Sequence, residues 1–194
     1  MGNILEKLMK TLTNILESSV TPLCESLLDD FEDLSSKLDP RQEVEKFLQD
    51  NYTGIFVISK KPINGKYEVY GKSDISVKNH KLAELTNGLF IWDSAVRNFM
   101  CAGCRKLKSL EGAPRKVGES FDISWCFELE SLEGGPEEVG YNFSCSVCRK
   151  LKSLEGAPKK VGNHFFCNDC GKQFTEEEVR KVSDVKKTVV TKFR

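Results

Sequence analysis

A phrase of eleven residues recurs along this chain at a constant spacing. CRKLKSLEGAP stands at Cys104–Pro114 and returns unchanged at Cys148–Pro158, with a near copy, CFELESLEGGP, at Cys126–Pro136. The step from one copy to the next is 22 residues. Phenylalanine keeps the same step, at Phe99, Phe121, Phe143 and Phe165. A fixed period over three full units and part of a fourth indicates a solenoid, in which each unit packs on its neighbours.

Each unit predicts one short strand, a corner, a return segment and a bend. Phe99 and Cys101 lie two positions apart, so they share one face of a strand. Leu107 and Leu110 lie three apart, which indicates a helical or irregular turn on the return side. The Glu-Gly-Ala-Pro segment then bends the chain, because glycine permits unusual backbone angles and proline fixes one. Stacked units would pair their strands in parallel at about 4.8 Å.

With phenylalanine and cysteine in two strand positions and cysteine at the corner, the unit resembles the leucine-rich repeat. More narrowly, LKSLEGAP followed by VG and F-x-C is similar to the leucine-rich-repeat-like proteins that tailed phages and some bacteria encode. The resemblance covers residues 67–174. It implies an α/β fold: a short leucine-rich-repeat-like solenoid with a parallel strand column, N-terminal helices and hairpin, and a C-terminal capping helix. It also implies an interaction scaffold that holds its partner on the strand face.

The repeat divides the chain into four parts. The first part carries apolar residues at helical three-to-four spacing, which predicts amphipathic helices. The parts are an N-terminal amphipathic helical segment (1–51), a hairpin and degenerate entry repeat (52–92), the solenoid of about four coils (93–174), and a C-terminal capping helix and tail (175–194).

Both ends of the solenoid are expected to be covered, because open sheet edges invite pairing with other chains. The segments GIFVISK and KYEVYG, joined through Pro-Ile-Asn-Gly, predict a hairpin that covers the N-terminal edge. The entry repeat then places Val77 one period before Phe99. At the other end, Thr175 and Glu178 have capping-box spacing and predict a helix that closes the last coil.

The N-terminal residues 1–40 leave three roles open. They can pack on the solenoid as a cap, form a homo-oligomer as a structural subunit would, or dock on another protein. Acidic residues between Glu25 and Asp33 disfavour binding at a membrane surface.

Four cysteines, Cys145, Cys148, Cys167 and Cys170, form two C-x-x-C pairs separated by eighteen residues, a spacing found in zinc sites. They carry the alternative hypothesis of a zinc-binding nucleic-acid-binding module. The middle copy argues against it, because Ile123 replaces the first cysteine there and a packing position tolerates that exchange. We therefore favour structural thiols and expect no cofactor and no metal.

The return segments of the first and third copies are basic, as a nucleic-acid track would require. The middle copy carries carboxylates instead, at Glu128, Glu130, Glu137 and Glu138. Stacked copies would set basic, acidic and basic rows side by side, which favours ion pairing between coils and interrupts a phosphate track. Nucleic acid is therefore disfavoured as a partner.

The outward positions of the strand column vary from coil to coil, whereas the inward positions repeat. Aromatic residues among them are suited to anchor a partner, because interface energy concentrates in aromatic side chains. The candidate partner-binding residues are Met100, Asp122, Trp125, Tyr141, Phe166 and Asn168.

Composition excludes several classes of function. Lys and Arg number 29, as do Asp and Glu, so no net charge steers the chain to nucleic acid or to an anionic membrane. No apolar run is long enough to span a membrane. The N-terminus lacks the pattern of a secretory signal, so we expect the eight cysteines to be reduced in a cytosol. The two histidines, His80 and His164, belong to no catalytic motif, and we expect no enzyme.

Together, the residues and the resemblance predict a non-catalytic protein–protein interaction scaffold. The resemblance adds that it is phage-encoded, either a virion component or an inhibitor of a host protein. It would act in the host cytoplasm or within a virion.

Overall fold

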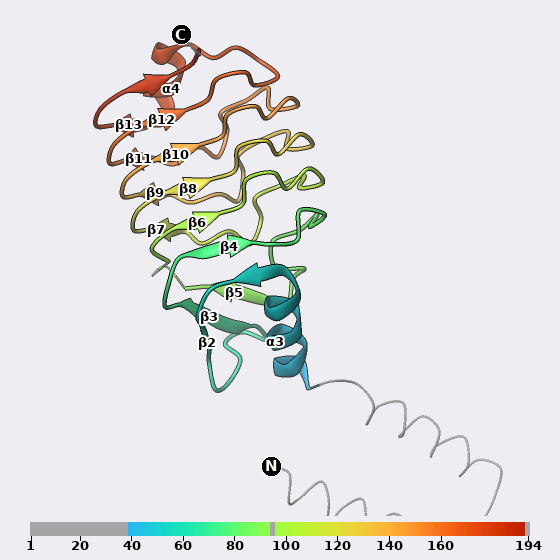
Figure 1. The fold of residues 1–194 in the computed structure, drawn as a ribbon. Coiled ribbons are helices and arrows are strands. Elements are labelled where there is room, and N and C mark those ends of the chain that lie inside the picture. The colour runs from blue at the N-terminus through green and yellow to red at the C-terminus, as the bar shows by residue number, and fades with distance from the viewer. Residues whose placement is uncertain (1–38, 94–95, 193–194) are drawn as a thin grey trace, which may run out of the picture. The chain divides into compact units, whose positions relative to one another are not determined.

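The described part of the chain is mostly β and forms a β-solenoid (Figure 1). The computed structural model describes residues 39–93 and 96–192. The amphipathic helices expected before residue 39, and self-association through residues 1–40, therefore lie outside or at the edge of the described residues.

The main sheet stacks one strand from each coil in parallel. A Phe ladder runs through it in register, Phe99 on Phe121, Phe121 on Phe143 and Phe143 on Phe165. Their ring centroids lie 5.5, 5.9 and 4.8 Å apart and all four rings are fully buried. The parallel strands are β4 (Ile75–Val77), β6 (Phe99–Met100), β8 (Phe121–Asp122), β10 (Phe143–Ser144), β12 (Phe165–Phe166) and β14 (Val189–Val190). Burying a phenylalanine stabilises the fold by about 1.5 to 3 kcal/mol, so this ladder is a principal source of stability.

A second parallel sheet forms where each coil runs back toward the next strand. Its strands are β7 (Lys116–Val117), β9 (Glu138–Val139), β11 (Lys160–Val161) and β13 (Asp184–Val185). In every strand the valine is buried and the residue before it faces solvent or is half-buried, as the two-residue alternation of a strand requires.

The return segments are turns and not helices. Leu107 and Leu110 are fully buried, and their segment carries hydrogen-bonded turns. Of the two alternatives for this segment, the irregular turn is the one observed. The predicted solenoid with a parallel strand column is confirmed, and within the described coils its architecture is β rather than alternating α and β.

The entry region departs from the predicted register. Phe99 pairs with Ile75, so Val77 lies two residues further along its strand than expected. Ile75 and Val77 are both buried, so the predicted alternation of inward and outward residues along this strand is correct. The residue that pairs with Phe99 is Ile75, one inward position before the predicted Val77. The step from Ile75 to Phe99 is therefore 24 residues, two more than the period of the repeat.

The predicted hairpin is confirmed, but another segment covers the sheet edge. Strand β2 (Phe56–Ile58) pairs antiparallel with β3 (Tyr67–Gly71), and β3 pairs with β5 (Phe90–Trp92) in a separate three-stranded sheet. The edge of the main sheet is covered by β1 (Tyr52–Thr53), which follows helix α3 (Pro40–Asn51).

The predicted C-terminal helix is confirmed as α4 (Glu176–Val182), with both hydrogen bonds of the capping box between Thr175 and Glu178. The residues after it are more than a tail. Strands β13 and β14 follow α4 and add one further strand to each sheet. Neither α3 nor α4 is long and apolar enough to cross a membrane.

Candidate functional site: the outer strand face and its two rims

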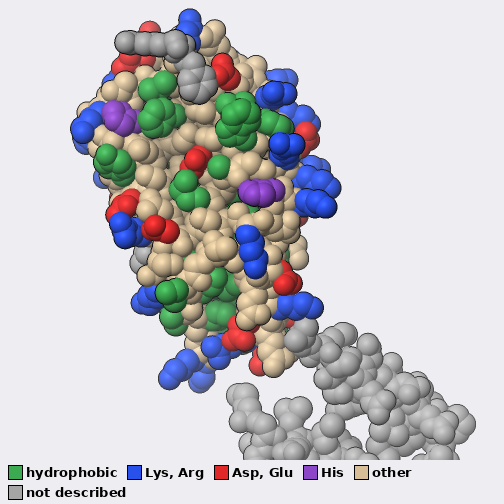
Figure 2. All heavy atoms as spheres, in the orientation of Figure 1, with side chains coloured by type: hydrophobic (Ala, Val, Ile, Leu, Met, Phe, Trp, Pro, Cys, Tyr) green, Lys and Arg blue, Asp and Glu red, His purple; other side chains and the backbone are tan. Residues whose placement is uncertain are grey.

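The outer face of the main sheet presents partly buried side chains flanked by exposed aromatic ones. Met100, Asp122 and Phe166 are half-buried on this face. Trp125 and Tyr141 flank the strands, and each is 51% exposed. Figure 2 shows hydrophobic side chains over the strand column and Lys and Arg crowded along the edge toward which the strands run.

Asn168 is the exception among the predicted partner-binding residues. It is only 2% exposed, and its amide oxygen accepts a hydrogen bond from Ser146 at 2.7 Å. Its amide nitrogen donates to Asp169 at 3.1 Å. The expectation that Asn168 is exposed to a partner is therefore wrong, because its side chain is buried and its polar groups are engaged by Ser146 and Asp169.

The corner cysteines Cys126, Cys148 and Cys170 each close their coil by a hydrogen bond to the coil before it. Each thiol donates to the carbonyl oxygen of the strand residue 25 positions earlier. These bonds run from Cys126 to Cys101 at 3.4 Å, from Cys148 to Ile123 at 3.2 Å and from Cys170 to Cys145 at 3.2 Å. The corner column is therefore both packed and hydrogen-bonded, which explains why cysteine is kept where a plain hydrophobe could fill the space.

The four cysteines of the zinc alternative show no metal-binding arrangement. No group of three or more His, Cys, Asp or Glu side chains is placed to hold a metal ion in the described part of the chain. Burial raises the pKa of Cys145 and Cys148 and raises that of Cys167 to about 12. Hydrogen bonding with Cys145 lowers the pKa of Cys170.

The residue before each corner cysteine has a left-handed backbone. The positive φ angles are 78° at Gly103, 65° at Trp125, 61° at Val147 and 56° at Asp169. Glycine adopts this conformation freely and aspartate tolerates it, whereas a bulky or β-branched side chain is strained in it. Trp125 and Val147 therefore occupy positions that local backbone preference would give to glycine.

The corner continues into a stack of two cations on one aromatic ring. Arg105, Phe127 and Arg149 share one column of the repeat, and the two guanidinium carbons lie 5.5 and 4.8 Å from the Phe127 centroid. The Trp125 ring lies 6.2 Å from that of Phe127. We call Arg105, Lys106, Trp125, Phe127 and Arg149 the open rim.

Sequence reasoning missed Phe127, although a comparison of columns contains the signal. The middle copy places this aromatic residue, and not a carboxylate, between Arg105 and Arg149.

A groove lies beside the open rim. It has a volume of about 530 Å³ and is lined by His80, Lys81, Gly103, Arg105, Lys106 and Trp125. Its size is within the range of small ligand-binding clefts. Its lining contains three cations and no carboxylate.

The opposite rim of the same coils is electrically paired. We call the charged residues that flank the second sheet the paired rim: Arg115, Lys116, Glu137, Glu138, Lys159 and Lys160. Glu137 contacts Arg115 at 3.2 Å and Lys159 at 3.5 Å. Glu138 contacts Lys116 at 3.4 Å and Lys160 at 3.6 Å. The predicted pairing between coils is confirmed here and for Glu128 with Lys150 at 2.6 Å.

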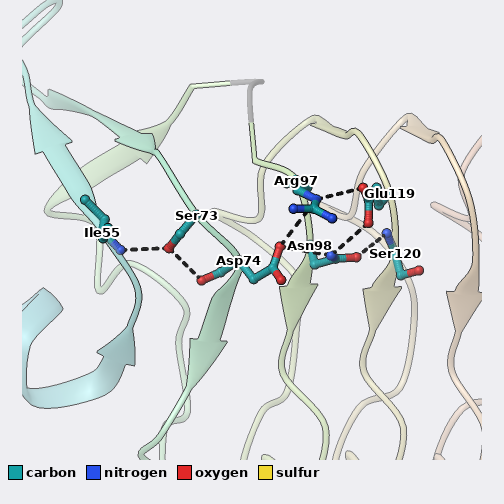
Figure 3. A network of polar contacts seen from close by, with 7 residues as sticks. All are labelled: Ile55, Ser73, Asp74, Arg97, Asn98, Glu119 and Ser120. Atoms are coloured by element: carbon teal, nitrogen blue, oxygen red, sulfur yellow. Dashed lines mark hydrogen bonds and ion pairs between the residues drawn. The ribbon is translucent and has the colours of Figure 1, made fainter.

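A polar network ties the entry repeat to the first coils (Figure 3). Arg97 donates to Glu119 at 2.7 Å, and this bond lowers the pKa of the Glu119 carboxyl. Asn98 donates to Asp74 at 2.9 Å and to Glu119 at 3.1 Å, and accepts from the backbone of Ser120 at 2.8 Å. These groups satisfy one another across three coils, so the network supports stacking and offers little free capacity to a ligand.

The histidines are not part of a catalytic assembly in the described residues. Neither the His80 nor the His164 imidazole hydrogen-bonds a serine, a cysteine or a carboxylate there. His164 lies 5.8 Å from Phe166, ring to ring, on the strand face. The absence of enzymatic activity stays a prediction.

The fold places the chain among β-solenoid repeat proteins. Compared with protein-family models, with curated proteins and with solved structures, the chain matches none. The surface described above is therefore the basis on which a function can be inferred.

Proposed function

We propose that the chain is a non-catalytic interaction scaffold that binds a protein partner through the outer face of its main sheet. The observation that carries this proposal is the contrast between inward and outward positions of the same strands. The inward Phe ladder repeats without change, while Met100, Asp122, Ser144 and Phe166 differ at equivalent outward positions. A repeat that only had to stack would have no need for such variety on one face.

The exposed aromatic residues support this proposal. Trp125 and Tyr141 each keep half of their surface exposed, which costs hydrophobic stabilisation that burial would supply. Large aromatic side chains are enriched among the residues that dominate binding energy at interfaces. The resemblance to leucine-rich-repeat-like proteins of phages supports the finer proposal of a phage-encoded virion component or host-protein inhibitor, acting in the host cytoplasm or the virion.

Affinity purification from the native host, followed by mass spectrometry, tests the proposal. The full chain and a Trp125→Ala, Phe166→Ala double variant serve as baits. A matched control carries Ile55→Ala and Ile91→Ala, because these two hydrophobic residues are also exposed but lie outside the main sheet. We expect a partner that the wild type and the control retain and the double variant loses. Equal retention by all three baits, with intact folding by circular dichroism, would contradict the assignment of the face.

A further inference from the structure

The guanidinium groups of Arg105 and Arg149 are held by one ring and are bonded to nothing else in the described residues. Each lies over a face of Phe127, from the coil before and the coil after it. Neither forms an ion pair or donates a side-chain hydrogen bond within the part of the chain described here. A guanidinium fixed in this way loses little conformational freedom when it binds a carboxylate through its N–H groups.

The cations of the adjoining groove are also unpaired. Lys81 and Lys106 line it together with Arg105, and within residues 39–93 and 96–192 no carboxylate forms an ion pair with any of the three. Glu128, the acidic residue next to Phe127, is already engaged by Lys150 at 2.6 Å. The paired rim shows that these coils can neutralise their cations, whereas the cations of the groove keep their charge available.

Trp125 adds an apolar wall to this cationic groove at a cost in backbone strain. Trp125 has a φ of 65°, and the equivalent position of the preceding coil is Gly103, which adopts a positive φ without strain because it has no side chain. An L-residue in the left-handed region costs roughly 1 to 2 kcal/mol relative to right-handed backbone. The same backbone recurs at Val147 and Asp169, so it belongs to the corner of the repeat, and Trp125 contributes to the groove through its exposed ring.

We propose that the open rim and its groove bind an acidic peptide segment of the protein partner, with carboxylates on Arg105 and Arg149 and an apolar side chain against Trp125. This inference rests on the proposed function and narrows it to one chemistry of partner. Nucleic acid fits less well, because a phosphate backbone needs free cations on successive coils. The middle coil places Phe127, Glu128 and Glu130 in the columns where its neighbours carry cations. Two further cations are paired, Lys150 with Glu128 and Lys172 with Glu178.

Fluorescence anisotropy with the full chain tests this proposal. The probe is a fluorescein-labelled decapeptide, EELEELEELE, at low ionic strength. Its matched control is QQLQQLQQLQ, which keeps length and leucines but has no charge. A labelled ten-nucleotide oligothymidine tests the nucleic-acid alternative. We expect the acidic peptide to bind at least roughly tenfold tighter than either of the other two probes, because paired guanidiniums recognise carboxylates through charge-assisted bonds.

Two double variants separate the open rim from general charge. Arg105→Gln with Arg149→Gln removes both stacked guanidiniums, and we expect affinity for the acidic peptide to fall at least roughly tenfold. Arg115→Gln with Lys159→Gln removes the same charge from the same coils on the paired rim, and affinity should stay within about twofold. Trp125 is half exposed and the other tryptophan, Trp92, is buried, so peptide binding should also protect tryptophan emission from acrylamide quenching.

Three results would overturn the proposal: no binding of the acidic peptide, equal loss in both double variants, or tighter binding of the oligothymidine that depends on Arg105 and Arg149. The purification described above keeps the two proposals distinct. A partner that needs Trp125 and Phe166 but is retained by the Arg105→Gln, Arg149→Gln bait would leave the interaction scaffold standing and remove the acidic-peptide site.

Discussion

The two rims of the solenoid are built from the same coils but differ in whether their cations form ion pairs. On the paired rim, Glu137 and Glu138 each lie between two cations of the neighbouring coils. On the open rim, the same middle coil offers Phe127 to two arginines. The first arrangement leaves charge satisfied inside the molecule, and the second leaves it available to a partner.

Glycines mark the places where the backbones of neighbouring coils come close to one another. Beside the paired rim, Gly118, Gly140 and Gly162 form a column in which neighbouring coils approach closely. In the open-rim column, a Cβ built on Gly103 would meet only His80, at 3.6 Å or more. Close apposition also occurs in the column of Arg105, Phe127 and Arg149, because a Cβ built on Gly171 would collide with the backbone carbonyl of Arg149.

The largest effect is expected from Gly140→Ala. A Cβ at Gly140 would collide with the backbone carbonyl of Gly118, which cannot move without displacing the coil. We expect a loss of roughly 3 kcal/mol or more in the free energy of unfolding, measured by urea denaturation. Gly118→Ala is the matched control, because its Cβ would meet the Val96 carbonyl oxygen at 3.7 Å, an ordinary contact. Equal losses in the two variants would show that close apposition is not what distinguishes this column.

The next effect concerns the thiol that holds the open rim in place. Cys126→Ala removes a fully buried sulfur and its hydrogen bond to the Cys101 carbonyl, which should destabilise the protein by about 1 to 3 kcal/mol. Cys104→Ala removes an equally buried sulfur whose thiol donates to no carbonyl among the described residues. The difference between the two variants in urea denaturation should be about 1 kcal/mol. Identical losses would mean that the thiol contributes only its volume.

Much of the fold could be predicted because each position of the repeat occurs several times, so its preferred residue type can be read from the copies. The Phe ladder follows from a column that repeats, and the ion pairs of Glu137 and Glu138 follow from columns that alternate in sign. The second sheet is not predicted, because each unit predicts only one strand. The open rim could not be predicted in full. The burial of Asn168 and the left-handed backbone at Trp125 depend on the corner geometry, which the two-residue alternation of a strand does not describe.

The predictions for the entry repeat and for the C-terminus were incomplete for a different physical reason. Pairing of Ile75 with Phe99 needs two additional residues in the coil, and β14 is separated from β12 by a coil lengthened by α4. A fixed period of 22 residues does not predict the register of a strand whose connection to the next strand is longer.

Trp125 allows the strain on the open rim to be measured directly. Both Trp125→Ala and Trp125→Gly remove the ring, but only glycine relieves the positive φ of 65°. We therefore expect the glycine variant to be about 1 kcal/mol more stable than the alanine variant by urea denaturation. Both should lose binding of the acidic peptide. An alanine variant at least as stable as the glycine variant would show that the left-handed backbone stores no strain at this position.

The smallest effect is expected on the paired rim, from Glu138→Gln. Hydrogen bonding with Lys116, helped by the charge of Lys160, lowers the pKa of the Glu138 carboxyl below its ordinary value of 4.5. A carboxyl with a lowered pKa in the folded state stabilises the fold above pH 4.5, and this contribution is lost as the pH falls through the lowered value. The variant should therefore melt slightly below the wild type at pH 7, with the difference vanishing in acid.

Glu130→Gln is the control for this measurement, because Glu130 is exposed in the same coil and forms no ion pair among the described residues. Its melting temperature should match that of the wild type at both pH values. A Glu138→Gln deficit that persisted in acid would reflect packing or hydrogen bonding instead of charge. In that case the sign of the charges on the paired rim would no longer explain why its cations, unlike those of the open rim, are unavailable to a partner.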